Sequence, residues 1–301
     1  MNYEKWLKSN TESLKNKTVV VTGSTGGIGQ ELCKILAQLD ANMLLVGRKA
    51  DALESQKAAL LKINNSIKVE YFQADFNCLA EVDKLAGCLS SKQVDVLIHN
   101  AGAYAVPRKF SDVGYDNVFQ INFISPFYLT KKLLPTLETA KDPRVVIVGS
   151  IAHTYDKFNP KDVDFRFNKK CNKVYGNSKR FLMFTFHEWF RELNSRVKLA
   201  VVHPGITFTN ITNHYPKFIY ALIKYPMKLI FMKPKKASLN LIKGVFTPTE
   251  YGTWIGPRVF NIWGLPKKKK LKIPAKESQL IFSAAQKVLV DAQERLKNKE
   301  I

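Results

Sequence analysis

The segment VVVTGSTGGIG, residues Val19 to Gly29, decides the fold of this 301-residue chain. Three valines lead into a stretch in which four of the last seven residues are glycine. Glycine loses more conformational entropy on folding than any other residue, so such a cluster needs a structural reason. A strand before the glycines and a helix after them supply one, because a helix N-terminus presents unpaired N–H groups and about half a positive charge. The segment predicts an anion site, typically for a dinucleotide pyrophosphate; a tight turn without a ligand is the alternative.

Short apolar runs alternate with longer helical ones over the first two thirds of the chain. Strands apolar at consecutive positions are typical of a sheet buried on both faces, and strand–helix–strand repeats about 30 residues apart require a parallel sheet. We predict one α/β domain over residues 1–301, a doubly wound parallel sheet of the Rossmann type. The expected strands span residues 18–21, 43–46, 67–72, 94–98, 144–148 and 199–202, and the expected helices span 30–39, 50–63 and 277–299. The lysine run at 267–270 is expected in an exposed loop.

The chain is strongly basic, with a formal net charge of +22. The excess is concentrated between Leu193 and Lys276, where sixteen Lys and Arg residues face one acid, Glu250. A solvated lysine-rich face and an anionic partner both stay open on this pattern. Nucleic-acid binding is disfavoured, because the basic residues are interleaved with core-type aliphatic residues and no recognition module is evident.

Cysteine usage and the N-terminal sequence favour a reduced compartment. The four cysteines form no C-x-x-C pair, which disfavours a disulfide framework. The N-terminus has no apolar core, so we expect no secretory signal, and the apolar run at 218–223 is far short of the ~20 residues of a spanning helix. We expect a cytoplasmic protein, with peripheral membrane contact left open. The five histidines show no metal-ligand spacing, so no metal is predicted.

Five further motifs follow the glycine turn in order. They are Asn100-Ala101-Gly102 after the fourth predicted strand, Asn122 in the next helix, Ser150 after the fifth strand, Tyr175-x-x-x-Lys179 in the following helix, and Pro204-Gly205 with Thr209 after the sixth strand. With the T-G-x-x-x-G-x-G spacing of residues 22–29, the set resembles the short-chain dehydrogenase/reductase family. The resemblance is close over residues 17–210 and looser beyond. It departs at Gly149, where the family often has serine.

The resemblance implies a catalytic role for four side chains. Tyr175 would be the general acid/base, and Lys179 would lower its pKa and bond the nicotinamide ribose. Ser150 would hold the substrate oxygen, and Asn122 would fix a water that passes protons towards Lys179. The i, i+4 spacing of Tyr175 and Lys179 places both on one helix face. A free tyrosine has a pKa of about 10, so proton exchange near pH 7 requires about 4 kcal/mol of stabilisation of the phenolate. An ordinary surface pair on a helix is the alternative.

Residues at the end of the second strand predict which nicotinamide is used. NAD sites usually place an acid there, but this chain has Arg48 and Lys49, and a guanidinium grips a 2′-phosphate bidentately. We predict NADP(H), although Ser24 and Thr25 stand where some relatives have a basic residue. Arg48 as a solvent-facing residue and Asp75 as a helix N-cap, rather than the acid near the adenine, are the alternatives. The predicted cofactor-binding residues are Thr22, Gly23, Ser24, Thr25, Gly27, Ile28, Gly29, Arg48, Asp75, Asn100, Ala101, Gly102, Tyr175, Lys179, Pro204, Gly205, Thr207 and Thr209.

Two segments bear on the substrate. The polar stretch between Ser150 and Tyr175 is long, which resembles the branch with retinol dehydrogenases; a neutral loop insertion is the alternative. Residues 206–245 are rich in aromatic and aliphatic residues with lysines at intervals, so we expect a substrate lid over an apolar pocket. The same pattern suits a membrane interface, although prolines at 216, 226 and 234 break any long helix.

The combined evidence favours an NADP(H)-dependent oxidoreductase that transfers hydride between nicotinamide and a carbonyl or alcohol of a lipophilic small molecule. An NADPH-binding regulator, or a membrane-surface protein without turnover, is the alternative. The intact Ser150, Tyr175 and Lys179 weigh against the regulator, because a sensor need not keep them. Relatives often pair through the helices carrying Asn122 and Tyr175, so a homo-oligomer is left open. The substrate is not specified, because one fold supports many chemistries.

Overall fold

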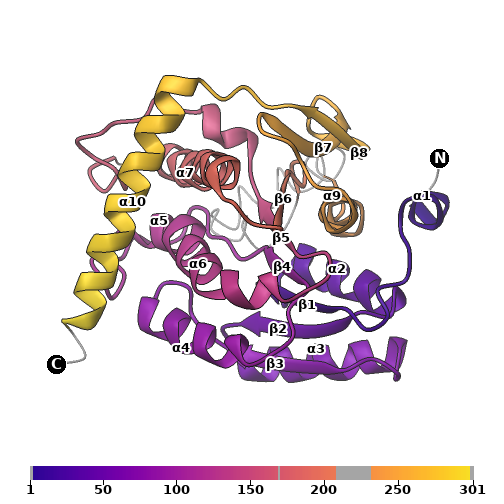
Figure 1. Ribbon diagram of the computed structural model, residues 1–301. Helices are drawn as coiled ribbons and strands as arrows, with labels where there is room; N and C mark the ends of the chain where they lie inside the picture. The colour runs from indigo at the N-terminus through magenta and orange to yellow at the C-terminus, as the bar shows by residue number, and fades with distance from the viewer. Residues whose placement is uncertain (1–2, 169, 208–231, 299–301) are drawn as a thin grey trace, which may run out of the picture.

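Eight strands form one mixed sheet in the order β3-β2-β1-β4-β5-β6-β7-β8 (Figure 1). The computed structural model describes residues 3–168, 170–207 and 232–298. The strands are β1 (Thr18–Thr22), β2 (Asn42–Gly47), β3 (Val69–Gln73), β4 (Val96–His99), β5 (Arg144–Val148), β6 (Lys198–Val202), β7 (Thr253–Val259) and β8 (Trp263–Lys270). Neighbouring strands from β3 to β7 pair in parallel, and β8 pairs antiparallel with β7.

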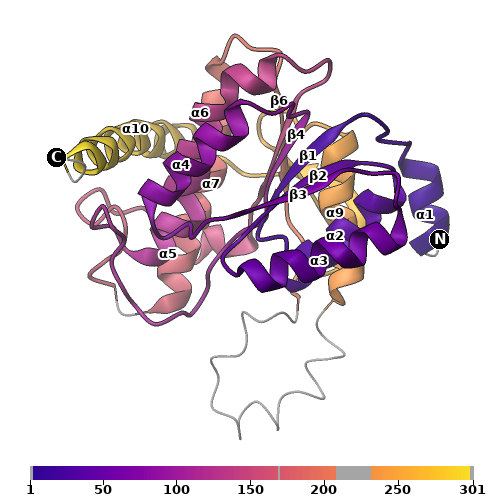
Figure 2. The same cartoon turned by 90° about the horizontal axis from the view of Figure 1, so that it is seen from below.

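Helices cover both faces of the sheet (Figure 2). On one face lie α1 (Tyr3–Asn10), α2 (Gly27–Gln38), α3 (Ala50–Ile63) and α9 (Pro234–Phe246). On the other lie α4 (Leu79–Ser90), α5 (Asn117–Phe119), the π-helical turn η1 (Gln120–Ile124), α6 (Ser125–Glu138), α7 (Cys171–Glu192) and α10 (Ala275–Lys297). A 3₁₀ turn, η2 (Ile151–Thr154), follows β5. Among the described residues, no helix is both long and apolar enough to cross a membrane.

The valines of β1 explain the two-sided packing. Val19 and Val21 belong to the hydrophobic core under α2, α3 and α9, whereas Val20 belongs to the core under α4, α6 and α7. Successive side chains of a strand point to opposite faces, so an unbroken apolar strand needs a helix layer on each side. The predicted doubly wound Rossmann fold is confirmed.

Most predicted elements lie where the sequence placed them, with one clear error. Strand β5 and helix α3 match their predicted ranges, and α10 begins two residues before the predicted range. The expectation of a loop at Lys267–Lys270 is wrong: these lysines end β8, an antiparallel edge strand (Figure 1). Charged side chains are tolerated there because an edge strand faces water, and lysines discourage further strand pairing.

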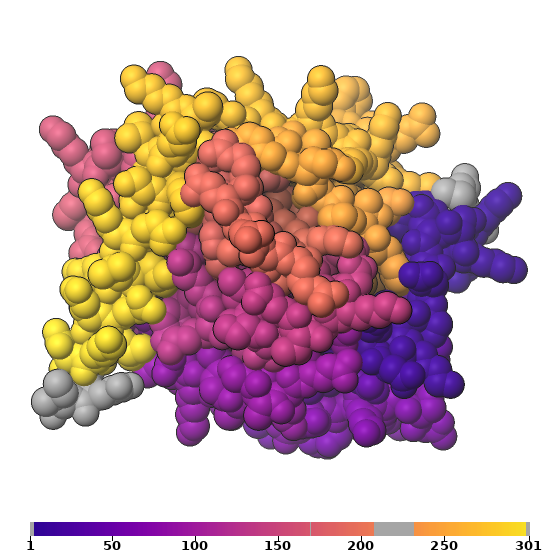
Figure 3. Space-filling view, viewed as in Figure 1, coloured from indigo at the N-terminus to yellow at the C-terminus, as the bar shows by residue number. Residues whose placement is uncertain are grey.

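After β6, the described part of the chain adds the helices α9 and α10. Residues 234–245 of the expected lid belong to α9, whose Leu239, Leu241 and Ile242 are buried in the core beside α2. The lid prediction therefore narrows to residues 206–233, of which 208–231 lie outside the described residues. Helix α10 packs along α7 and runs down one side of the molecule (Figure 3).

Candidate active site

The glycine turn joins β1 to α2 with almost no space for side chains. Gly23 has φ +63°, and a Cβ there would lie 2.8 Å from the Ala101 Cα. A Cβ on Gly29 would lie 2.3 Å from the Gly23 carbonyl oxygen. Helix α2 begins after Gly26, and no side chain caps it. Its first N–H groups are therefore available to an anion, as a pyrophosphate site requires.

Thr22 and Asn100 tie the ends of β1 and β4 together. The Thr22 Oγ1 accepts hydrogen bonds from the backbone N–H of Asn100 (3.1 Å) and of Ala101 (3.0 Å). In return, the Asn100 side-chain amide donates to the carbonyls of Thr22 (3.1 Å) and Gly23 (2.9 Å). These four bonds fix the glycine turn against the Asn-Ala-Gly turn, so both predicted motifs form one platform.

The residues expected to select the cofactor lie at the ends of β2 and β3. Ser24 is buried and donates to the Val46 carbonyl (3.3 Å), so its hydroxyl serves the turn itself. Arg48 is exposed one residue after β2, and its carbonyl accepts from the Gln73 side chain. The alternative for Asp75, a helix N-cap, is wrong: Asp112 accepts the N–H groups of Leu79 and Ala80 that open α4.

Lys179 and Asn122 reach the same spot from different elements. The buried Lys179 Nζ donates to the carbonyl of Val148, the last residue of β5 (2.8 Å). A Cβ on Gly102 would lie 3.6 Å from this Nζ and 3.2 Å from the Asn122 Oδ1, so Gly102 leaves room for both. Asn122 sits in the π-helical turn η1 and bonds the backbone of Ala103 through both ends of its amide (2.8 and 2.9 Å). π-helical turns often mark functional positions.

Tyr175 and Ser150 complete the cluster. Burial raises the pKa of Tyr175 to about 12, while a hydrogen bond with the Ser150 side chain acts in the opposite direction. Burial lowers the pKa of Lys179 to about 8. The Lys179 Nζ lies 5.9 Å from the centre of the Tyr175 ring. In this structure the Ser150 hydrogen bond lowers the pKa of the phenol, and the effect of Lys179 on that pKa stays a prediction.

Two contacts at the site carry no sequence signal. The Ser178 hydroxyl accepts from the Asn122 amide (2.9 Å) and donates to the Tyr175 carbonyl (2.7 Å), which links η1 to α7. The Tyr104 ring meets the Tyr175 ring edge-on, with centroids 4.9 Å apart. Ser178 lies between two motif residues on α7, but only the folded chain shows that it faces Asn122.

The last predicted motif follows β6. Gly205 has φ +86°, and a Cβ there would lie 2.8 Å from the Ile262 carbonyl oxygen in the β7–β8 turn. Pro204 precedes it, and the Thr207 hydroxyl donates to the Gly205 carbonyl (3.5 Å). Thr209 lies outside the described residues. Within the described ranges, no three His, Cys, Asp or Glu residues are grouped closely enough to hold a metal.

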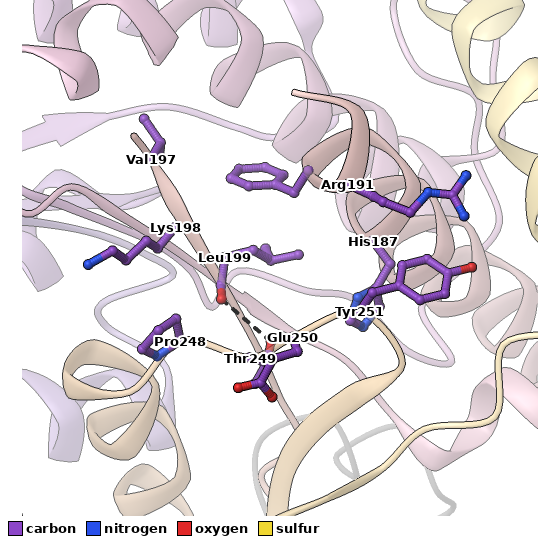
Figure 4. Close-up of a pocket in the computed structure, with 10 residues that line it drawn as sticks. His187, Arg191, Val197, Lys198, Leu199, Pro248, Thr249, Glu250 and Tyr251 are labelled. Atoms are coloured by element: carbon purple, nitrogen blue, oxygen red, sulfur yellow. Dashed lines mark hydrogen bonds between the residues drawn. The ribbon is translucent and has the colours of Figure 1, made fainter. Parts of the chain in front are cut away.

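A cavity of about 250 Å³ lies at the other end of β6, near the C-terminal end of α7 (Figure 4). His187 and Thr249 are among the residues that line it, and the charged ends of Lys198 and Arg191 point to opposite sides (Figure 4). Ligands of doubly wound sheets bind outside the carboxyl ends of the strands, whereas Lys198 is at the amino end of β6. We therefore place the site at the glycine turn and Tyr175, not in this cavity.

Fold and site together define a dinucleotide-binding α/β oxidoreductase. A family model described as short chain dehydrogenase matches residues 17–218, and the chain belongs to this family.

The similarity to individual proteins is low or covers only part of the chain. The short chain dehydrogenase resG of Aspergillus sclerotiorum is 37% identical over 160 residues, which cover 48% of this chain and 45% of that protein. The chain thus matches less than half of that relative's length. The polyprenol dehydrogenase of Homo sapiens is 27% identical over 77% of this chain and 73% of its own. A solved structure from Mycobacterium paratuberculosis shares the fold, with a TM-score of 0.76, 24% identity and 96% coverage of both chains.

Proposed function

We propose that this chain is an NADP(H)-dependent oxidoreductase that interconverts a carbonyl and an alcohol on a lipophilic small molecule. The observation that carries the proposal is the convergence of Ser150, Tyr175, Lys179 and Asn122 at the carboxyl ends of β4 and β5, beside the uncapped N-terminus of α2. When bound, the nicotinamide supplies the hydride chemistry. The residues at the glycine turn fit a dinucleotide, because the uncapped N–H groups of α2 adjoin a glycine-rich turn.

At neutral pH the site can supply the proton that reduction of a carbonyl requires. With its pKa raised to about 12, Tyr175 is a protonated phenol at neutral pH and can donate to a developing alkoxide. Ser150 holds the same oxygen through its hydroxyl, and preorganised donors of this kind stabilise the charge that develops there. Lys179, with a pKa of about 8, remains mostly protonated at pH 7 and keeps a positive charge close by.

The surroundings of the phenol support an apolar substrate. Tyr104 packs edge-on against Tyr175, and Val106 and Val174 belong to the small apolar cluster beside it. Arg48, exposed after β2, supports NADP(H), because no carboxylate occupies the end of that strand. The name of the human relative, polyprenol dehydrogenase, agrees with a lipophilic alcohol.

The test is a panel of aliphatic and aromatic aldehydes and ketones with NADPH, monitored by loss of NADPH absorbance. We expect turnover that Tyr175→Phe reduces by a factor of about 10² to 10⁴, the usual contribution of a general acid. Tyr251→Phe is the matched control, because Tyr251 is 38% exposed near the amino end of β6, away from Tyr175, and it should retain turnover. Tight NADPH binding without turnover of any carbonyl would favour the regulatory alternative.

A further inference from the structure

The loop between η2 and α7 buries one aromatic side chain in an unusual conformation. Phe165 is 3% exposed and has φ +54°, the left-handed region that bulky residues rarely adopt. Such backbone costs on the order of 1–3 kcal/mol and persists where the surrounding structure fixes it. Phe167, two residues further, is 78% exposed. The loop is therefore not a uniformly solvated insertion.

Phe165 belongs to the small apolar cluster against which Tyr175 packs. It forms a small apolar cluster with Val118 and Val174, against which Val106 and Tyr175 also pack. This cluster is separate from the two large cores on either side of the sheet. Tyr104 meets the Tyr175 ring edge-on. Tyr175 therefore lies between Tyr104, in the loop after β4, and the apolar cluster that contains Phe165.

Arg108 fixes Phe165 from the backbone side. Its guanidinium donates to the carbonyls of Phe165 and Asn168 (both 2.7 Å) and pairs with the Asp116 carboxylate (2.8 Å). Asp164 reinforces the arrangement, because its carboxylate accepts the Asp116 N–H (3.0 Å) and pairs with Arg166 (3.0 Å). Both carboxylates are almost fully buried, so each is held by charge-assisted bonds within the protein.

The same anchor supports the second half of the site. The Asp116 carboxylate also accepts the N–H groups of Val118 (2.9 Å) and Phe119 (3.3 Å) and so caps α5. Helix α5 runs directly into η1, which carries Asn122. The Arg108–Asp116 pair thus joins the loop that carries Phe165 to the turn that presents Asn122.

We propose that Phe165 is a positioning residue for the Tyr175 phenol and that Arg108 holds it in place. The expected effect on turnover rests on the proposed oxidoreductase function. The packing of Phe165 near Tyr175 does not depend on that function. A displacement of about 1 Å at a reacting group costs on the order of 100-fold in rate, so support for the phenol matters.

The kinetic test compares Phe165→Ala with Phe167→Ala, a matched truncation in the same loop. We expect Phe165→Ala to lower kcat at least tenfold with the KM for NADPH within twofold, Phe165→Leu to recover part of kcat, and Phe167→Ala to behave like the unaltered protein. Arg108→Ala should resemble Phe165→Ala, whereas Lys109→Ala should not. A rise in the KM for NADPH equal to the fall in kcat, or an unchanged kcat in both Phe165 and Arg108 variants, would overturn the proposal.

A second measurement does not depend on turnover. Tyrosine labelled with ¹³C at Cζ gives a signal for Tyr175 that Tyr175→Phe identifies by its loss. We expect Phe165→Ala and Phe165→Leu to shift or broaden this signal while Phe167→Ala leaves it in place. If the signal responds but no carbonyl is turned over, the packing role stands and the proposed function fails. If it is unchanged in the folded Phe165 variants, the positioning role is refuted.

Discussion

At the carboxyl edge of the sheet, buried Lys179, Asn122 and Ser150 approach one phenol from α7, η1 and the end of β5. At the amino edge, near the cavity of Figure 4, one buried carboxylate is paired locally. The buried Glu188 accepts from the Tyr251 hydroxyl (2.6 Å) and pairs with Arg191 (2.5 Å). The cavity is at the second edge, but the convergent, titratable groups are at the first. Ligands in this fold bind at the carboxyl ends of the strands, so a cavity at the amino edge does not mark the active site.

Removing the Ser150 hydroxyl, at the carboxyl edge, should cause the largest loss of turnover. Ser150→Ala deletes a donor to the developing oxyanion, so we expect kcat to fall about 100-fold or more. The Ser150 hydrogen bond lowers the pKa of Tyr175, so its loss should also move the alkaline limb of the pH–rate profile upward. Steady-state kinetics between neutral and alkaline pH measure both changes. An unchanged pH–rate profile would show that Ser150 does not affect the pKa of the Tyr175 phenol.

Arg48 should set the preference for NADPH over NADH. Its substitution should change the kinetics less than the loss of the Ser150 hydroxyl does. A hydrogen bond to a charged group contributes about 1.5–3 kcal/mol, so Arg48→Gln should raise the KM for NADPH about tenfold or more. NADH kinetics should stay within twofold, because NADH carries no 2′-phosphate. Lys62→Gln, an exposed cation in the last turn of α3, is the control. Equal changes in the KM for NADPH and for NADH would show that Arg48 does not bind the 2′-phosphate.

A substitution at the amino edge of the sheet should change the stability of the protein and not its turnover. Burial lowers the pKa of His187 to about 4, below its usual value near 6.5. The unfolded chain therefore binds this proton more readily, and the contribution of His187 to stability is lost as pH falls from about 6.5 towards 4. Urea unfolding measures the free energy of unfolding at pH 7 and at pH 5. Between these two pH values it should fall by about 2 kcal/mol less for His187→Gln than for the unaltered protein. Turnover at pH 7 should be unchanged; a large loss of kcat would mean that the two edges are coupled.

The parts of the fold that local sequence controls were predictable. Val19–Val21 and the glycines after them specify a doubly buried strand and its turn through near-neighbour chemistry alone. The four catalytic candidates were found by motif order, and the structure brings their side chains together. Lys267–Lys270 were misassigned because their strand is created by pairing with β7, which the lysines themselves do not encode.

The supports of the site were not predictable. The left-handed backbone of Phe165 and the reach of Arg108 across 57 residues of sequence leave no local pattern. Neither does the Ser178 bridge between Asn122 and Tyr175. Such contacts depend on how two loops dock, so only the folded chain reveals them.

A crystal structure of the protein with NADP⁺ tests the central claim most directly. We expect the pyrophosphate on the first N–H groups of α2 and the nicotinamide beside Ser150, Tyr175 and Lys179. A dinucleotide seated at the amino edge, in the cavity lined by His187 and Thr249, would contradict the assignment of the active site.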